Sequence, residues 1–133
     1  MSPQDLASAY LKHYRSGDAD DFWAFEDVID ACGNLHDGFP IAVALIFQAQ
    51  DDLELAYVAA GPIEDLLKWH GTPALALFEK AATNSEKVRR ALASVWIRDT
   101  DEAYSRWFAL MELYGFQSQV QRGKLRRNAK REN

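Results

Sequence analysis

The apolar residues of this chain recur every three to four positions, and no stretch alternates apolar and polar residues for long enough to predict a strand. A segment with this periodicity folds as an amphipathic helix that buries one face. The pattern therefore predicts an all-α fold, an irregular bundle or short stack of helical hairpins made of seven to eight short helices. We find no repeat period that would predict a solenoid.

Capping residues predict where the helices begin and end. Ser2 followed by Pro3 predicts the start of the first helix, because proline in the first helical position loses no hydrogen bond. Ser16-Gly17 predicts its end. The run 41–47 is apolar on nearly every side, so we expect the third helix to lie at the centre of the fold. A break is predicted at Gly61-Pro62, because proline cannot donate the helical hydrogen bond and disfavours helix in the residue before it.

The spacing of the large apolar residues predicts which helix faces are buried. In the second helix we expect Phe22, Phe25, Ile29 and Cys32 to form the inward stripe. In the sixth helix the same spacing predicts that Trp96 faces inward, with Val88, Leu92 and Val95.

The charge of the chain is unevenly distributed. Residues 1–114 hold 9 Lys and Arg against 19 Asp and Glu, a net charge of −10, whereas residues 115–133 hold 6 against 1, a net charge of +5. We expect one helical domain over residues 1–115 and a basic C-terminal tail over residues 116–133, partly helical or disordered. Such asymmetry bears on partners rather than on the fold.

Composition also suggests a location. Cys32 is the only cysteine, so no intrachain disulfide can form, which suits a reducing compartment. The first residues lack the basic and apolar regions of a signal peptide, and no apolar run is long enough to cross a bilayer. We therefore expect a cytoplasmic protein that does not enter a membrane.

The segment from Gly61 to Gly71 concentrates the residue types that carry chemistry. Its members of interest are Gly61, Pro62, Glu64, Asp65, Trp69, His70 and Gly71. Most of them are explained by starting and ending one short helix, with the two acidic residues in its first turn, Lys68 four positions after Glu64, and glycine at its exit. The alternative is an enzyme site that uses Glu64, Asp65 and His70. Their spacing does not place these three on one helix face, so we assign no catalytic residue.

Two groups of acidic residues are candidates for binding a partner. They are Asp18, Asp20, Asp21, Asp27, Asp30, Asp51, Asp52 and Glu54. These residues can be interpreted as a solvated helix surface or as a docking surface for a basic protein. Their spacing matches no EF-hand or other metal-binding motif, so we predict no metal and no cofactor.

The basic tail is a candidate for contact with nucleic acid. Its cations are Arg122, Lys124, Arg126, Arg127, Lys130 and Arg131. They could contact phosphates, but no aromatic residue lies among them to read a base, so sequence-specific binding is not expected. Solubility, or contact with the acidic body of the protein, explains the tail equally well.

The central segment resembles a bacterial domain family of unknown function. Ala59-Ala60-Gly61-Pro62-Ile63-Glu64-Asp65-Leu66-Leu67, followed by His70-Gly71, by Arg90-Ala91-Leu92 and by Val95-Trp96, is similar to the Gly-Pro-Leu-Glu-Asp-Leu-Leu…His-Gly core of that family. The similarity covers about residues 22–97, with Ile63 where leucine is usual. It implies a helical fold and a bacterial origin, and it implies no activity or cofactor.

The sequence favours a non-enzymatic protein-binding module with an acidic surface, of the kind found in inhibitors with immunity or anti-defence roles. The alternatives are the enzyme site at Glu64, Asp65 and His70, and nucleic-acid association through the tail. Sequence alone does not indicate the oligomeric state.

Overall fold

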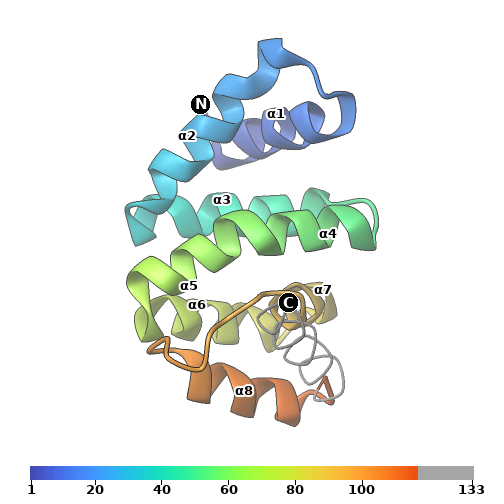
Figure 1. Ribbon diagram of the computed structural model, residues 1–133. Coiled ribbons are helices and arrows are strands. Elements are labelled where there is room, and N and C mark those ends of the chain that lie inside the picture. The colour runs from blue at the N-terminus through green and yellow to red at the C-terminus, as the bar shows by residue number, and fades with distance from the viewer. Residues whose placement is uncertain (117–133) are drawn as a thin grey trace, which may run out of the picture.

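The computed structural model describes residues 1–116, and the helices of this part are stacked in layers (Figure 1). In chain order they are α1 (Pro3–Ser16), the 3-10 turn η1 (Ala19–Asp21), α2 (Phe22–Cys32), α3 (Leu35–Gln48), α4 (Asp52–Val58), the π turn η2 (Ala59–Ile63), α5 (Glu64–His70), α6 (Thr72–Ala82), α7 (Glu86–Ala93) and α8 (Tyr104–Leu113). In Figure 1, α1 and α2 form one end of the stack, α3 with α4 and α5 the middle, and α6, α7 and α8 the other end. The predicted all-α fold is confirmed.

The first helix begins and ends where the sequence predicts. The Ser2 hydroxyl oxygen accepts a hydrogen bond of 3.0 Å from the Asp5 N–H, which satisfies a donor that the helix itself cannot satisfy. Gly17 ends the helix with a φ of 68°, a backbone conformation that costs glycine little.

Helix α3 is the centre of the fold, as predicted. It contacts α1, α2, α4, α5, α6 and α7. Its inward residues Ala42, Leu45 and Ile46 are fully buried. The helix begins at Leu35, because the Asn34 side chain accepts a hydrogen bond from the Asp37 N–H and so caps it.

The break predicted at Gly61-Pro62 is wrong. Helices α4 and α5 are joined by the π turn η2 into one continuous helix over residues 52–70. The N–H of Glu64 donates to the carbonyl of Ala59, five residues back, and this wider turn accommodates a proline that has no N–H to donate. Two side chains from other helices contact the turn: the Tyr10 hydroxyl lies against Gly61, where a Cβ would be 3.0 Å away, and the Cys32 Sγ lies 3.9 Å from the Pro62 carbonyl oxygen.

The predicted inward stripe of α2 is wrong for two of its four residues. Phe22 and Ile29 are exposed, with the Phe22 ring stacked on Phe25, and Phe25 is only partly buried. The residues that face the core are Ala24, Val28 and Cys32, and all three are buried. Ala24 and Val28 are smaller than the aromatic residues that we expected on this side of the helix. Small side chains let α2 lie close to its neighbours α1 and α3.

The prediction that Trp96 faces inward is also wrong. Helix α7 ends at Ala93, so the helical spacing no longer applies to the residues that follow. In the non-helical segment after it, Val95 and Ile97 are buried and Trp96 between them is exposed, which is the alternation of an extended chain.

The last helix is attached to the rest by a buried tryptophan. The Trp107 indole N–H donates a hydrogen bond of 2.9 Å to the carbonyl of Leu92, which links α8 to α7. Phe116, which the sequence places in the tail, packs against the core in this region. The rest of the predicted tail lies outside the described residues.

Candidate functional site

Gly71 ends α5 in a conformation that favours glycine, as predicted. Its φ is 64°, and its N–H donates to the Leu67 carbonyl. A side chain at this position would also collide with the carboxylate of Glu102. The Glu102 carboxylate also accepts a hydrogen bond from the Thr72 hydroxyl. The loop before α8 therefore contacts and stabilises the turn between α5 and α6.

The acidic pair and the histidine of the central segment do not converge. Successive residues of a helix are rotated by about 100°, so Glu64 and Asp65 point in different directions and His70 in a third. The His70 Nε2 lies 2.8 Å from the Cys32 carbonyl oxygen, which can only accept, so this nitrogen donates. His70 therefore joins the end of α5 to the end of α2.

Asp65 of α5 and Cys32 of α2 both lie where these two helices pack against each other. Asp65 is half-buried, and burial raises the pKa of its carboxyl group, an effect that Lys68 partly offsets. Burial, and secondarily the Asp65 charge, raises the pKa of the Cys32 thiol to about 12. Since the thiolate is the nucleophile, this buried cysteine is suited to packing rather than to catalysis.

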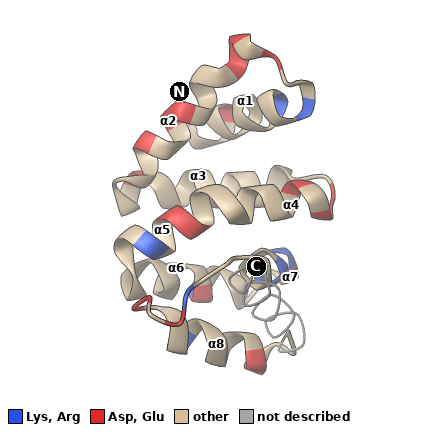
Figure 2. Cartoon of the chain, in the orientation of Figure 1, with Lys and Arg blue, Asp and Glu red and all other residues tan. Residues whose placement is uncertain are grey.

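The predicted acidic residues lie in two separate places (Figure 2). The first group belongs to η1 and α2, at the end of the stack, and the second lies at the start of α4. In the first group Asp18, Asp20, Asp27 and Asp30 are exposed, whereas Asp21 is partly buried with its carboxylate 3.6 Å from the Lys12 ammonium.

In the second group, Glu54 differs from Asp51 and Asp52. It is only 6% exposed. Its carboxylate accepts two hydrogen bonds of 2.7 Å from the Arg15 guanidinium and one of 2.9 Å from the Gln50 N–H. Arg15 and the other donors lower the pKa of Glu54. Glu54 therefore holds α4 to α1 and adds nothing to an exposed acidic surface, while Asp51 and Asp52 stay exposed.

The outward side of α2 combines large apolar residues with acidic ones. We call it the α2 face; it consists of Phe22, Trp23, Glu26, Asp27, Ile29 and Asp30, all of which are exposed. The exposed fractions of Phe22, Trp23 and Ile29 are 46%, 40% and 36%. The sequence predicts Asp27 and Asp30 of this face as candidate binding residues, but sequence reasoning missed the apolar ones. The alanines at positions 24 and 31, on the opposite side of the helix, were the signal that could have indicated the true inward side.

The α2 face lies within a long stretch that contains no positive side chain. Residues 16–67 hold twelve Asp and Glu and no Lys or Arg. The basic residues of the rest of the described chain lie on α1 and after the start of α5. Six of these twelve acidic residues lie at η1 and α2, against Lys12 and Arg15 on the neighbouring α1, so the α2 end of the protein carries a net negative charge.

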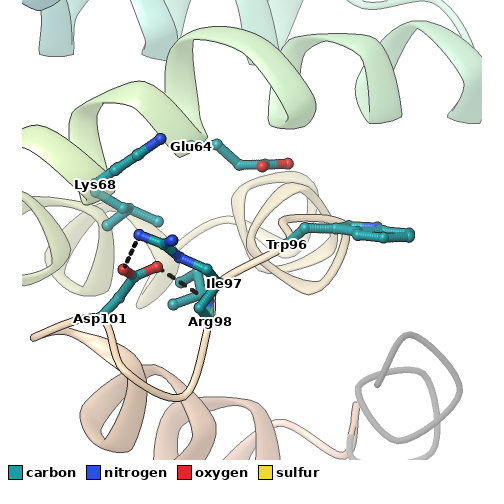
Figure 3. Close-up of a pocket in the computed structure, with 7 residues that line it drawn as sticks. Glu64, Lys68, Trp96, Ile97, Arg98 and Asp101 are labelled. Carbon is teal, nitrogen blue, oxygen red and sulfur yellow. Dashed lines mark hydrogen bonds and ion pairs between the residues drawn. The ribbon is translucent and has the colours of Figure 1, made fainter. Parts of the chain in front are cut away.

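A cavity lies between α5 and the loop that joins α7 to α8 (Figure 3). Its volume is about 200 Å³, and its lining consists of Glu64, Leu67, Lys68, Trp96, Ile97, Arg98 and Asp101. Arg98 and Asp101 are paired within the loop, with a Nη2–Oδ1 distance of 3.2 Å. In Figure 3 the Glu64 side chain extends from α5 toward the side of the cavity where the Trp96 indole lies.

The described residues contain neither a metal-binding cluster nor a membrane-spanning helix. Within residues 1–116, no three His, Cys, Asp or Glu side chains are arranged so that they could hold a metal ion. No helix of this part of the chain is both long and apolar enough to span a bilayer. The six predicted tail cations lie outside the part of the chain described here, so their contact with nucleic acid stays a prediction.

The fold defines a small all-α protein in which the π turn η2 joins α4 and α5 into one helix and whose candidate sites lie at the surface. Residues 12–112 match the family of unknown function DUF6869, and the chain belongs to that family. The family membership predicted from the central segment is confirmed. No curated protein and no solved structure matches the chain significantly.

Proposed function

We propose that this protein is a non-enzymatic protein-binding module that binds a basic partner protein through the α2 face. The observation that supports this most is the composition of that face, in which three exposed apolar side chains lie among three exposed carboxylates. Isolated exposed apolar residues are common, but a group of them on one helix face is typical of interaction sites.

The two kinds of residue contribute differently to binding. Trp23 and Phe22 offer aromatic surface that a partner can bury, and tryptophan is among the residues that contribute most energy at interfaces. The carboxylates, together with the rest of the negative stretch, attract a positive surface from a distance and increase the association rate. The proposed partner is therefore a protein with a positively charged surface that includes an apolar pocket or groove.

More specifically, we propose that the protein inhibits its partner, in a role of the immunity or anti-defence type. A basic surface on a partner is commonly one that contacts nucleic acid, and carboxylates on α2 would occupy the place of phosphates. The proposed location is the bacterial cytoplasm, where the buried thiol of Cys32 stays reduced.

The positions of Glu64, Asp65 and His70 support a binding function rather than a catalytic one. Glu64 lines the cavity, Asp65 lies on the side of α1 and α2, and His70 is bonded to a backbone carbonyl. A general base must lie within reach of the same substrate atom as its partners, and these three groups are not arranged in that way.

The test begins with identification of the partner. Proteins crosslinked to the purified full chain in a lysate of its own host are identified, and each is expressed and purified for binding measurements. Trp23→Ala is expected to weaken binding by about tenfold or more, because a half-exposed tryptophan is replaced at the centre of the contact. Asp27→Lys is expected to slow association and to reduce its dependence on salt between about 0.1 M and about 1 M.

Two matched variants serve as controls. Trp96 is 41% exposed, almost the same as Trp23, and lies in the loop after α7, so Trp96→Ala is expected to leave binding unchanged. Glu112 is exposed on α8, and Glu112→Lys is the control for charge reversal. If the purified partner binds the Trp23 and Asp27 variants as tightly and as fast as it binds the unmodified protein, the α2 face is not the binding site and the proposal is wrong.

A further inference from the structure

Aromatic side chains from α1, α2 and α4 contact one another in an unbroken series. We call this series the aromatic strip; in order of contact it consists of His13, Phe22, Phe25, Tyr10, Tyr57 and Tyr14. We propose that the aromatic strip binds arginine side chains of a basic protein. The partner is the basic protein proposed above, so this assignment rests on that function and adds which residue type the partner presents.

The contacts between the rings hold the aromatic strip in shape. The ring centroids of Tyr14 and Tyr57 are 4.1 Å apart, and the other contacts of the strip have centroid distances from 5.4 to 6.0 Å. Tyr10 is only 2% exposed and belongs to the core, and its ring contacts both Phe25 and Tyr57. Because the rings are ordered before a ligand arrives, binding costs little side-chain entropy at this surface.

Ring surface is accessible toward both ends of the aromatic strip. Phe22 is 46% exposed and Tyr14 is 38% exposed. The Tyr57 ring lies against one face of the Tyr14 ring, at an interplanar angle of 21°, so the exposed surface of Tyr14 includes its opposite face. The face of an aromatic ring carries partial negative charge, and a positive group is therefore attracted to it.

The positive side chains that the protein itself places beside the aromatic strip are engaged with carboxylates. The Arg15 guanidinium donates two hydrogen bonds of 2.7 Å to Glu54, and the Lys12 ammonium lies 3.6 Å from the Asp21 carboxylate. These pairs neutralise much of the positive charge of α1. A cation from another protein therefore meets little repulsion at the strip.

Exposed carboxylates border the Phe22 end of the aromatic strip. Asp18 and Asp20 lie in the turn just before α2, and the His13 ring, which contacts Phe22, donates a hydrogen bond of 2.8 Å to the Asp18 carbonyl. Both aspartates are exposed, and within residues 1–116 no Lys or Arg forms an ion pair with either of them. A cation over the Phe22 ring would therefore be attracted by these carboxylates as well as by the ring.

Arginine fits this surface better than lysine. A guanidinium is planar, so it can stack on a ring and keep the N–H groups at its edge free to bind a carboxylate, whereas an ammonium is a compact and strongly hydrated charge. The described residues already contain one contact of this kind, in which Arg89 Cζ lies 4.2 Å from the centroid of the Tyr114 ring. No Lys or Arg of residues 1–116 lies over a ring of the aromatic strip in the same way, so these rings are open to a guanidinium from another protein.

The test compares three short peptides in which glycine alternates with arginine, lysine or citrulline. Lysine keeps the charge of arginine without the planar group, and citrulline keeps the planar group without the charge. Binding to the full chain is measured by isothermal titration calorimetry and by the NMR shifts of the Tyr14 and Phe22 ring protons. The arginine peptide is expected to bind with a Kd below about 1 mM, and the lysine and citrulline peptides are each expected to bind about tenfold more weakly.

Variants then assign the binding to the aromatic strip. Tyr14→Leu and Phe22→Leu keep an apolar side chain but remove a ring face, and each is expected to weaken binding of the arginine peptide about threefold. Phe47→Leu is the matched control, because Phe47 on α3 is 56% exposed and lies outside the strip, and it is expected to change nothing. The double variant Asp18→Asn with Asp20→Asn is expected to weaken the arginine and lysine peptides by the same factor, because it removes charge and leaves the rings. Circular dichroism checks that every variant is folded.

Three outcomes would overturn the proposal. The first is that the arginine peptide does not bind. The second is that the lysine or the citrulline peptide binds as tightly as the arginine peptide. The third is that Phe47→Leu weakens binding as much as Tyr14→Leu and Phe22→Leu do. The peptides are independent of the natural partner, so if they fail these tests while Trp23→Ala weakens binding of the partner, the α2 face remains the binding site and only the role of the aromatic strip is wrong.

Discussion

At the scale of single residues, the pair Arg15–Glu54 shows how a charge can be misread from the sequence. Glu54 follows two exposed aspartates and looks like part of the same acidic surface. In the structure its side chain is 7% exposed, and Arg15, 39 residues away, forms two hydrogen bonds to it. Such a contact depends on how α1 and α4 pack, and no local spacing predicts it.

Glu54→Gln is predicted to lower the free energy of unfolding by about 1.5 kcal/mol at pH 7. Charged hydrogen bonds contribute about 1.5–3 kcal/mol, and the lower end applies because the Arg15 side chain is more than a third exposed and partly screened by water. Urea unfolding followed by circular dichroism measures the difference. Asp52→Asn, at an exposed pair with Arg90, is the control and is expected to cost less than about 0.5 kcal/mol.

The same pair predicts how the effect of this substitution depends on pH. The folded-state pKa of Glu54 is lowered, so its contribution is complete above the unfolded pKa of about 4.3 and is lost as the pH falls through the folded value. The difference between the unmodified protein and Glu54→Gln is therefore expected to shrink between pH 7 and about pH 3. A difference that stays constant over this range would contradict the ion-pair interpretation.

At the scale of helices, the sequence predicts starts and ends well where the signal is local. Ser2 with Pro3, Gly17 and Gly71 all act where the sequence places them, because a cap is formed by residues within one turn of each other. The prediction fails at Gly61-Pro62, where the π turn continues the helix and Tyr10 and Cys32 from other helices lie against it. It fails again for Phe22, because the inward side of a helix is decided by its neighbours, and for Trp96, because α7 ends before this residue.

The continuous helix predicts slow amide exchange across the π turn. The N–H of Glu64 is bonded to Ala59, so hydrogen exchange measured by NMR is expected to be at least roughly a hundredfold slower at Glu64 than in an unstructured peptide. Leu55, within α4, is the internal reference and is expected to be protected as well. If Glu64 exchanges at the unstructured rate while Leu55 is protected, the chain breaks at Gly61-Pro62 and the original expectation for this segment holds.

At the scale of the whole molecule, charge is separated along the chain. The stretch 16–67 carries twelve negative side chains and no Lys or Arg, whereas the described residues from Lys68 to Phe116 carry seven positive and six negative ones. Like charges at the α2 end repel each other in the folded protein, and this repulsion lowers its stability.

Salt is therefore predicted to stabilise the fold. Raising the salt concentration from about 0.01 M to about 0.15 M shortens the Debye length from about 30 Å to about 8 Å and weakens the repulsion. The midpoint of thermal unfolding, measured by circular dichroism, is expected to rise by a few degrees, equivalent to about 1 kcal/mol. A double variant, Asp20→Asn with Asp27→Asn, is expected to show a smaller rise, and a midpoint that falls with salt would rule out repulsion as the main effect.

The division of α2 between small inward residues and large outward ones has a consequence for evolution. The buried residues of the helix are Ala24, Val28 and Cys32, whereas Trp23 and its apolar outward neighbours are partly exposed. Substitutions on the outward side are therefore expected to cost less stability than those on the inward side. Family members can thus vary these outward positions, and with them the binding surface proposed above, while keeping the same scaffold.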